Sequence, residues 1–265
     1  MADDGKYLLG NLEPEAASRL QALSSLFDAG TFAHLERLGI GEGWRCWEAG
    51  AGSASVPSYL AARVGDSGYV LATDLEPSML PGAAGFDIRH HELGSDPAPE
   101  GGFDLVHVRL VLVHVRNRDQ ALSDLVSSLR PGGWLLVEEA DPSLQPLVCP
   151  DERGDEERLA NRLKDGFREL MAARGVDLAF GRTLPRRLRE AGLEDVEADA
   201  WFPITSPACE VLELATLAQI RQRLISAGLA TAEEIDRHVD HVREGRLDLA
   251  TSPLVSAWGR RGGVG

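Results

Sequence analysis

The stretch Trp44-Arg-Cys-Trp-Glu-Ala-Gly-Ala-Gly-Ser-Ala54 decides the fold of this chain. An apolar run ends in the carboxylate of Glu48 and continues into the turn Gly50-Ala51-Gly52, which a helix-compatible run at 56–64 follows. A short strand, a Gly-x-Gly turn and a helix are the opening βα unit of a doubly wound sheet, which binds its ligand at this turn. The stretch therefore predicts an α/β protein with a ligand site at residues 48–52.

The residues around this turn indicate which ligand it binds. Glu48 would repel the pyrophosphate of NAD or FAD, and Ser55 stands where the dinucleotide fingerprint has its third glycine. The next expected strand, 69–73, ends in Asp74, which is placed to accept hydrogen bonds from a ribose diol. A ligand with an adenosine end, a cationic amino acid end and no phosphate suits these residues, and S-adenosylmethionine is such a ligand.

Landmarks further along the chain extend this interpretation to a family. In order they are Glu48-Ala-Gly-Ala-Gly52, Asp74, Phe103-Asp-Leu-Val106 and Leu129-Arg-Pro-Gly-Gly-Trp134. With them the chain resembles the class I S-adenosylmethionine-dependent methyltransferases of small-molecule, natural-product type. The resemblance covers residues 40–140 and departs from the family pattern at Ala54, where a third glycine is common.

The resemblance implies a set of cofactor contacts. It places the cofactor against residues of the turn, of the second strand's end and of the turn after the third strand: Glu48, Gly50, Ala51, Gly52, Asp74, Leu75, Glu92 and Leu93. For Glu92 the alternative is a solvated turn carboxylate. Tyr7 would lie on a helical lid over the cleft, or else be an ordered aromatic residue near a terminus.

Hydrophobic periodicity supplies the other elements. Further strands are expected at 86–91, 103–108, 134–137, 196–204 and 254–258, and helices at 119–129, 156–173 and 183–191. We therefore expect a doubly wound, Rossmann-like seven-stranded sheet with an N-terminal helical lid and a helical insertion between its last two strands.

The same reading divides the chain into four parts. Residues 1–43 form the lid, from two amphipathic helices, and residues 44–204 form the cofactor-binding core, with a loop and helix at 142–175. Residues 205–253 are the insertion, whose second helix begins with the capping box Thr231 and Glu234. Residues 254–265 hold the last strand and tail. The insertion is expected to be an acceptor-pocket wall, a homodimer surface, or some of both.

Candidates for a proton-accepting base lie at the carboxyl edge of the sheet, where open α/β sheets bind ligands. His114 follows the fourth strand, and an ordinary histidine pKa of about 6.5 permits proton acceptance near neutrality. Glu138 and Glu139 follow the fifth strand, with Asp141 behind them, and burial could raise the pKa of one of these carboxyls. The alternatives are a packed or capping histidine, and carboxylates that face water wherever strand alternation points them outward.

Two more basic groups need an interpretation. Arg109, directly after the fourth strand, is expected to face the cofactor or the acceptor, whereas His107 is expected to be a packed core histidine. A group of arginines would meet an anionic acceptor such as a diphosphate, or else form a solvated helix face. Its members are Arg182, Arg186, Arg187 and Arg189.

Composition excludes several function classes. A formal net charge of −15 argues against a nucleic-acid partner, because phosphate binding needs a basic surface. The three cysteines lack CxxC spacing, so neither zinc nor a disulfide framework is expected, and the acidic loop 151–157 does not match a calcium-binding loop. No apolar run reaches membrane-spanning length. We expect a cytoplasmic protein without a metal or a membrane partner.

Three functions fit these observations. The first is methyl transfer from S-adenosylmethionine to oxygen, nitrogen or carbon of a small-molecule acceptor, which we expect to be a specialised metabolite. The second keeps the cofactor but catalyses a cyclisation or rearrangement, which the same fold would support. The third is a non-catalytic binding protein that has kept the pocket, which the intact Glu48, Gly50, Gly52 and Asp74 disfavour.

Overall fold

The computed structural model of the 265-residue chain describes residues 8–10, 14–80 and 85–263. Tyr7 therefore lies outside the described residues. The chain separates into two compact units. One comprises residues 28–140, 180–201 and 254–265, here called the sheet unit, and the other comprises residues 1–27, 141–179 and 202–253, here called the helical unit.

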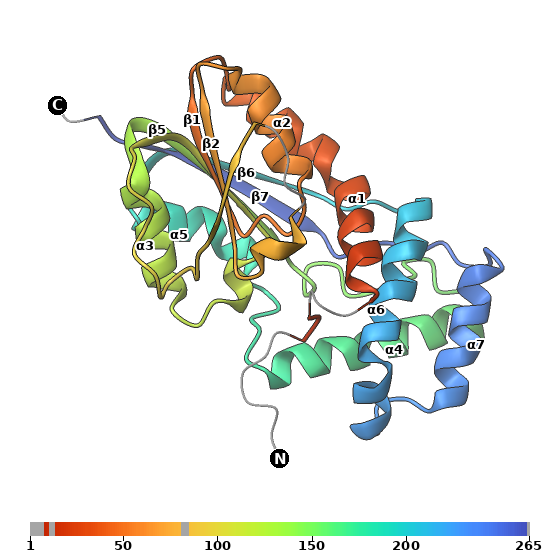
Figure 1. The fold of residues 1–265 in the computed structure, drawn as a ribbon. Coiled ribbons are helices and arrows are strands. Elements are labelled where there is room, and N and C mark those ends of the chain that lie inside the picture. Colours follow the sequence, from red (N-terminus) through yellow and green to blue (C-terminus); the bar gives the residue numbers. More distant parts are fainter. Residues whose placement is uncertain (1–7, 11–13, 81–84, 264–265) are drawn as a thin grey trace. The chain divides into compact units, whose positions relative to one another are not determined.

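The sheet unit has at its centre one mixed sheet, whose strands within the described residues run in the order β3-β2-β1-β4-β5-β7-β6 (Figure 1). Strands β1 to β5 are parallel, and β7 lies antiparallel between β5 and β6. This confirms the seven-stranded sheet and the pairing of its last two strands. The strands are β1 (Arg45–Ala49), β2 (Tyr69–Asp74), β3 (Asp87–His90), β4 (Phe103–Arg109), β5 (Leu129–Ala140), β6 (Leu193–Trp201) and β7 (Leu254–Arg261).

Helices cover both faces of this sheet, as a doubly wound fold requires. Helix α2 lies on one side and α3 and α5 on the other (Figure 1). The α2 face is closed by a buried cluster that includes Leu35, Cys46, Leu60, Leu105 and Trp258. The helices are α2 (Ser55–Val64), α3 (Arg118–Ser128) and α5 (Leu184–Glu190), and short 3-10 turns occur at η1 (Pro77–Met79), η2 (Leu112–His114) and η3 (Gly181–Thr183).

The N-terminal segment forms one long helix, α1 (Ala16–Arg37), where two had been predicted. Gly30 lies inside it, and the buried positions remain in phase across this glycine: Leu26 and Phe27 are buried before it, and Thr31 and Leu35 after it. One glycine costs a helix only about 1 kcal/mol relative to alanine. That cost does not end a helix whose one face is buried along both halves.

The helical unit contains α4 (Asp155–Ala173), α6 (Pro207–Ser226) and α7 (Ala232–Arg243). Its core joins the apolar stripe of α4, including Leu159 and Leu163, to Leu217, Ile220 and Leu224 of α6. Segment 141–179 therefore groups with the helices of 202–253. From the sequence we expected its loop and helix, at 142–175, to belong to the cofactor-binding core. The predicted capping box of α7 is confirmed: Thr231 Oγ1 accepts from the amide of Glu234, and Glu234 Oε2 accepts from the amide of Thr231.

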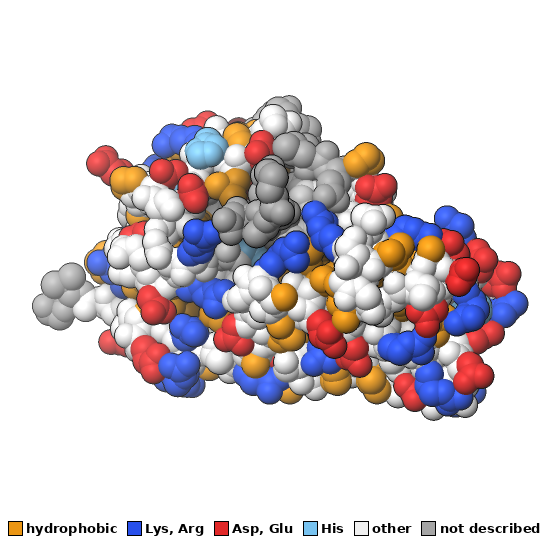
Figure 2. Space-filling model, turned by 90° about the horizontal axis from the view of Figure 1, so that it is seen from below, with side chains coloured by type: hydrophobic (Ala, Val, Ile, Leu, Met, Phe, Trp, Pro, Cys, Tyr) orange, Lys and Arg blue, Asp and Glu red, His pale blue; other side chains and the backbone are white. Residues whose placement is uncertain are grey.

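The surface carries charges of both signs (Figure 2), and the cysteines are buried. On the face drawn in Figure 2, basic and acidic side chains are mixed over the described residues. Cys46, Cys149 and Cys209 are free and buried. Within the described ranges, no helix has the length and apolar character needed to cross a membrane, and no three His, Cys, Asp or Glu side chains gather in a way that could hold a metal ion.

Candidate functional site

The glycine turn connects β1 to α2 at the carboxyl edge of the sheet. Gly50 and Gly52 have φ values of 73° and 59°, in the left-handed region that favours glycine. The amides of Gly50 and Ala51 both donate to the carbonyl oxygen of Thr73 in β2, at 2.8 and 2.9 Å. A Cβ on Gly50 would lie 2.4 Å from Cγ2 of Val111. The turn is therefore closed against its neighbours at this position, and only glycine fits there.

Asp74, the last residue of β2, is bonded to this turn. Its Oδ2 accepts from the amide of Gly52 at 2.8 Å, and its Oδ1 accepts from the amide of Glu76 at 2.9 Å. The side chain is largely buried. A carboxylate has about four acceptor positions on its two oxygens, so each oxygen retains capacity for another hydrogen bond. This arrangement fits a ribose diol held beside the glycine turn.

Glu48 lies at the other end of the turn and is 2% exposed. Its Oε2 is 2.6 Å from Nδ1 of His107, the residue directly opposite it on β4. Its second oxygen, Oε1, accepts no hydrogen bond from any residue that the structure describes. An unpartnered carboxylate oxygen beside the turn fits the cationic amino acid end of S-adenosylmethionine, because a buried carboxylate is stabilised by a donor of opposite charge.

The residues predicted to contact ribose and adenine follow β2 and β3. Leu75 is 56% exposed and presents apolar surface next to Asp74. Leu93 is buried, whereas Glu92 is exposed and donates its amide to Asp96 Oδ2 at 2.8 Å. Both strands end at the edge where the glycine turn lies. The roles of Leu75, Glu92 and Leu93 in binding remain predictions.

Arg109, at the end of β4, is engaged by helix α1 within the sheet unit. Its Nη2 forms an ion pair with Asp28 Oδ1 at 2.8 Å, and its Nη1 donates to Thr31 Oγ1 at 2.9 Å. Only 10% of its side chain is exposed. These contacts within the protein are sufficient to explain the position of the Arg109 side chain. Its contact with the cofactor or the acceptor remains a prediction.

Glu138 is completely buried and accepts hydrogen bonds from several directions. Thr31 donates to its Oε2 and Ser256 to its Oε1 at 2.7 Å, while His107 Nε2 lies 3.3 Å from Oε2. His34 Nδ1 is 3.4 Å from Oε1. Burial by itself would raise the pKa of Glu138, but the imidazoles of His107 and His34 beside it hold that pKa well below its usual range. A carboxylate held in this way stays ionised and is a poor proton acceptor.

Glu139 faces the opposite side of the sheet and is also completely buried. Its Oε1 accepts from the amides of Val111, Leu112 and Val113, at 3.0, 2.6 and 3.4 Å. Its Oε2 has no partner among the described residues. Burial raises the pKa of this carboxyl to about 7, although the three amides oppose the rise. Glu139 thus anchors the segment that carries Val111 beneath the glycine turn.

These two glutamates correct one expectation from strand alternation. Where strand alternation turns a carboxylate of β5 outward, we expected that carboxylate to face water. Helices and loops cover both faces of the sheet, so neither Glu138 nor Glu139 is exposed. Asp141 is buried as well, and its Oδ1 accepts from the amide of Leu144 within the helical unit. Of the proposed bases, His114 is exposed, at the end of η2. Its role in proton transfer remains a prediction.

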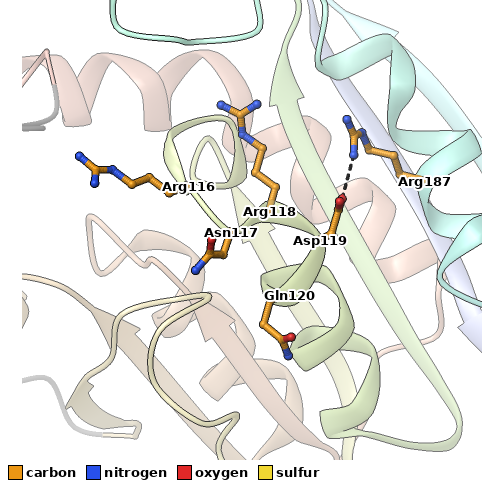
Figure 3. Close-up of a pocket in the computed structure, with 6 residues that line it drawn as sticks. All are labelled: Arg116, Asn117, Arg118, Asp119, Gln120 and Arg187. Carbon is orange, nitrogen blue, oxygen red and sulfur yellow. Dashed lines mark hydrogen bonds and ion pairs between the residues drawn. The ribbon is translucent and has the colours of Figure 1, made fainter.

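The predicted arginine group does not converge on one place. Arg186 pairs with Glu190 on its own helix, and Arg189 donates to the carbonyl of Val196. Arg187 alone among the four lines an open cavity of about 580 Å³ at the start of α3, where it pairs with Asp119 at 3.1 Å (Figure 3). The cavity lining comprises Arg116, Asn117, Arg118, Asp119, Gln120 and Arg187.

We did not predict from the sequence that a row of buried polar side chains crosses the sheet beneath α1. Its members are Glu48, His107, Glu138 and Ser256. Glu48 is paired with His107 across β1 and β4, and Ser256 of β7 is paired with both Glu138 and Asp199. The burial of His107 was predicted, but its two carboxylate partners were not. Strand alternation could have indicated this pairing, because it gives the face of the sheet on which Glu48 and His107 lie. The register of β1 and β4 is also needed to show that the two residues are opposite each other.

Comparison with known proteins agrees with this geometry. A family model described as a methyltransferase domain matches residues 47–137. Methyltransferase str3 of Strobilurus tenacellus is 30% identical over 194 residues, which make up 71% of this chain and 66% of that protein. The chain thus spans just under two thirds of the length of this relative. The matched domain runs from β1 into β5 and contains the glycine turn and Asp74.

Solved structures of similar fold cover most of the chain. Phosphoethanolamine N-methyltransferase 2 of Haemonchus contortus, in complex with S-adenosylmethionine, superposes with a TM-score of 0.57 at 15% identity, over 99% of this chain and 61% of that one. The [4+2]-cyclase SpnF gives a TM-score of 0.53 at 16% identity, over 90% and 82%. At such identities the likeness concerns the fold alone.

Proposed function

Since the chain belongs to the class I S-adenosylmethionine-dependent methyltransferases, we propose that it transfers a methyl group from this cofactor to a small-molecule acceptor. The observation that carries the proposal is the glycine turn flanked by two buried carboxylates, Glu48 and Asp74. They give the site carboxylate acceptors at both ends of the turn, which suit the ammonium and ribose groups of this cofactor. We expect the acceptor to be a specialised metabolite, methylated at oxygen, nitrogen or carbon.

The residues of the sheet unit would hold the cofactor by its polar ends. Glu48 Oε1 would accept from the ammonium group, and Asp74 would accept from the ribose hydroxyls while it keeps the amide of Gly52. Leu75 and Leu93 would supply apolar contact for the adenine, with Glu92 at its polar edge. Charge-assisted hydrogen bonds of this kind are about twice as strong as neutral ones, so the two carboxylates would dominate recognition.

The chemistry needs little more than alignment. When bound, S-adenosylmethionine supplies a methyl group on a positively charged sulfur, which is already a good leaving group. The protein would contribute by holding the acceptor in line with that group, and such positioning lowers a barrier by several kcal/mol, on the order of 7–11 in favourable cases. A base is needed only where the acceptor must lose a proton.

His114 is the candidate base that fits this site. It ends η2, directly after the segment that Glu139 anchors under the turn, and it is exposed, so an acceptor can reach it. Glu138 and Glu139 are fully buried, and each accepts hydrogen bonds from protein groups. For these two we propose a structural role within the site in place of the predicted catalytic one.

A labelled-methyl assay tests the proposal. Purified protein is incubated with S-adenosylmethionine carrying a trideuterated methyl group and a small-molecule metabolite extract, and the products are resolved by mass spectrometry. We expect one or more compounds to gain a trideuteromethyl group, together with release of S-adenosylhomocysteine. The Asp74→Asn variant should lose this product, while Glu42→Gln, at an exposed position outside the site, should retain it. Tight cofactor binding without any labelled product would contradict methyl transfer.

The same assay separates the non-methylating alternative. If a compound in the extract is converted without gaining the label, and S-adenosylhomocysteine supports that conversion equally well, the reaction is a cyclisation or rearrangement. The fold does not decide between the two, because function depends on the site.

An anionic acceptor is a second candidate for the substrate class. The observation that favours it is the arginine-lined cavity at α3, which adjoins the turn after β3 through the bond from Asn117 Nδ2 to the carbonyl of Gly94. Arg116 is exposed, and Arg116→Gln removes its charge. If this variant loses activity only on a phosphorylated acceptor, the result would support this class. Equal activity of Arg116→Gln on every acceptor would argue against it.

A further inference from the structure

A buried histidine bridge connects the cofactor turn to the centre of the sheet. His107 is 0% exposed, with Nδ1 2.6 Å from Glu48 and Nε2 3.3 Å from Glu138. Both ring nitrogens therefore face a carboxylate oxygen. A neutral imidazole has only one N–H and would turn a lone pair toward one of these anions, whereas an imidazolium donates to both. Although burial alone would lower the pKa of His107, the two carboxylates raise it to about 9.

Glu138 is itself held on every side, so it is a fixed end for this bridge. Thr31 and His34 contact it from α1, and Ser256 contacts it from β7. Glu48, by contrast, has His107 as its one hydrogen-bond partner among the described residues. The orientation of the Glu48 carboxylate is thus determined by the histidine, and the orientation of the histidine by Glu138.

We propose that His107 is a positioning residue for cofactor binding: by occupying Oε2 of Glu48, it directs Oε1 toward the amino acid end of the ligand. This inference rests on the proposed function and names a residue for it that does not touch the ligand. A carboxylate held by one charged donor cannot rotate without breaking that bond, so its free oxygen is already oriented before the ligand arrives. Preorganisation of this kind increases affinity by removing the cost of ordering the group.

The contact between His107 and Glu48 should affect the binding of only one part of the ligand. S-adenosylhomocysteine carries the amino acid end that Glu48 would contact, whereas 5′-methylthioadenosine has the same adenosine and lacks that end. Loss of the His107–Glu48 bond should therefore weaken binding of the first compound and leave binding of the second nearly unchanged. A residue that merely stabilised the sheet would affect both compounds alike.

Two substitutions at one position separate the two halves of the bridge. In His107→Asn the side-chain amide takes the place of Nδ1 and can still donate to Glu48, whereas in His107→Gln it takes the place of Nε2 and can donate only to Glu138. By isothermal titration calorimetry, we expect the Gln variant to bind S-adenosylhomocysteine about tenfold more weakly, which corresponds to about 1.4 kcal/mol. The Asn variant should stay within about threefold of the wild type, and both should bind 5′-methylthioadenosine like the wild type.

A matched control is available in the helical unit. His238 is also 0% exposed, and its Nε2 lies 3.1 Å from Glu213 Oε1. His238→Asn, whose amide takes the place of Nδ1, therefore removes the bond of a buried histidine–glutamate pair of the same kind. It should lower stability and leave the ratio of the two affinities unchanged. Should His107→Gln fail to fold, ¹⁵N-histidine spectra of the wild type give an independent test: both nitrogens of His107 should be protonated, and their shifts should respond to S-adenosylhomocysteine but not to 5′-methylthioadenosine.

The outcomes are distinguishable. Equal weakening of both ligands by His107→Gln, or no weakening of either, would overturn the positioning role, as would a neutral His107 in the spectra. If the wild type itself gives no heat with S-adenosylhomocysteine, then the proposed function fails before the variants are compared.

Discussion

Replacing Gly50 by alanine tests the geometry of the glycine turn. The backbone there has a φ of 73°, and the left-handed region costs a residue with a Cβ about 1–2 kcal/mol. The new Cβ would also lie 2.4 Å from Val111 Cγ2, and forcing extra atoms into a packed site typically costs about 1–3 kcal/mol. We therefore expect Gly50→Ala to lower the free energy of unfolding by about 2–5 kcal/mol.

Gly192 provides the matched comparison. It has a φ of 84°, but a Cβ there would meet no atom within 4 Å, so Gly192→Ala carries the backbone cost without the clash. Urea denaturation of both variants should place Gly50→Ala lower in stability by about 1–3 kcal/mol, the share due to the clash. Calorimetry with S-adenosylhomocysteine should show weakened binding for Gly50→Ala only. Equal stability of the two variants would refute the close approach of Val111 to the turn.

Three further predictions concern single interactions. Glu139→Gln should change the pH dependence of stability: the folded pKa of Glu139, about 7, exceeds its ordinary value of 4.5, so its contribution is full below pH 4.5 and is lost as pH rises to about 7. The variant should lack this loss, which a pKa difference of this size puts on the order of 3 kcal/mol, in denaturation curves taken from pH 4 to 8. Curves of the variant and the wild type that run parallel would contradict it. Asp74→Asn should weaken S-adenosylhomocysteine binding at least about tenfold, because an amide group would face the Gly52 or Glu76 amide, and unchanged affinity would count against the ribose contact. Thr231→Ala should lower the stability of the helical unit by about 0.5–2 kcal/mol through loss of its cap, as thermal denaturation would show, with Thr231→Ser as the variant that retains it.

The sheet was predictable because its signals are local. An apolar run that ends in Gly50-Ala51-Gly52 gives the first βα unit, and Asp74 at the end of the next strand marks the same edge of the sheet. The capping box of α7 is equally local, since both partners lie within one turn of helix. Such patterns depend on neighbouring residues and need no knowledge of the tertiary structure.

The buried polar network was not predictable in the same way. Its members, such as His107, Glu138 and Ser256, come from separate strands, and their meeting depends on strand order and register. The prediction that a carboxylate on β5 would face water failed for the same reason, because alternation tells which face a side chain lies on but not what covers that face. Grouping of α4 with α6 and α7 likewise depends on which apolar stripes meet.

Helix α1 shows how tertiary packing decides a boundary. A glycine within an otherwise helical pattern is consistent with either one helix or two. Asp28 and Thr31, just before and after Gly30, both contact Arg109 of β4. The buried face of α1 thus continues across the glycine against partners that the local sequence does not reveal.

The central claim is that the turn between Glu48 and Asp74 binds S-adenosylmethionine. The most direct measurement is a calorimetric titration of the wild-type protein with S-adenosylhomocysteine, alongside the Glu48→Gln and Asp74→Asn variants. We predict saturable binding of one molecule per chain to the wild type and clearly weaker binding to each variant. Absence of heat with the wild type, or equal affinity in all three proteins, would contradict the claim.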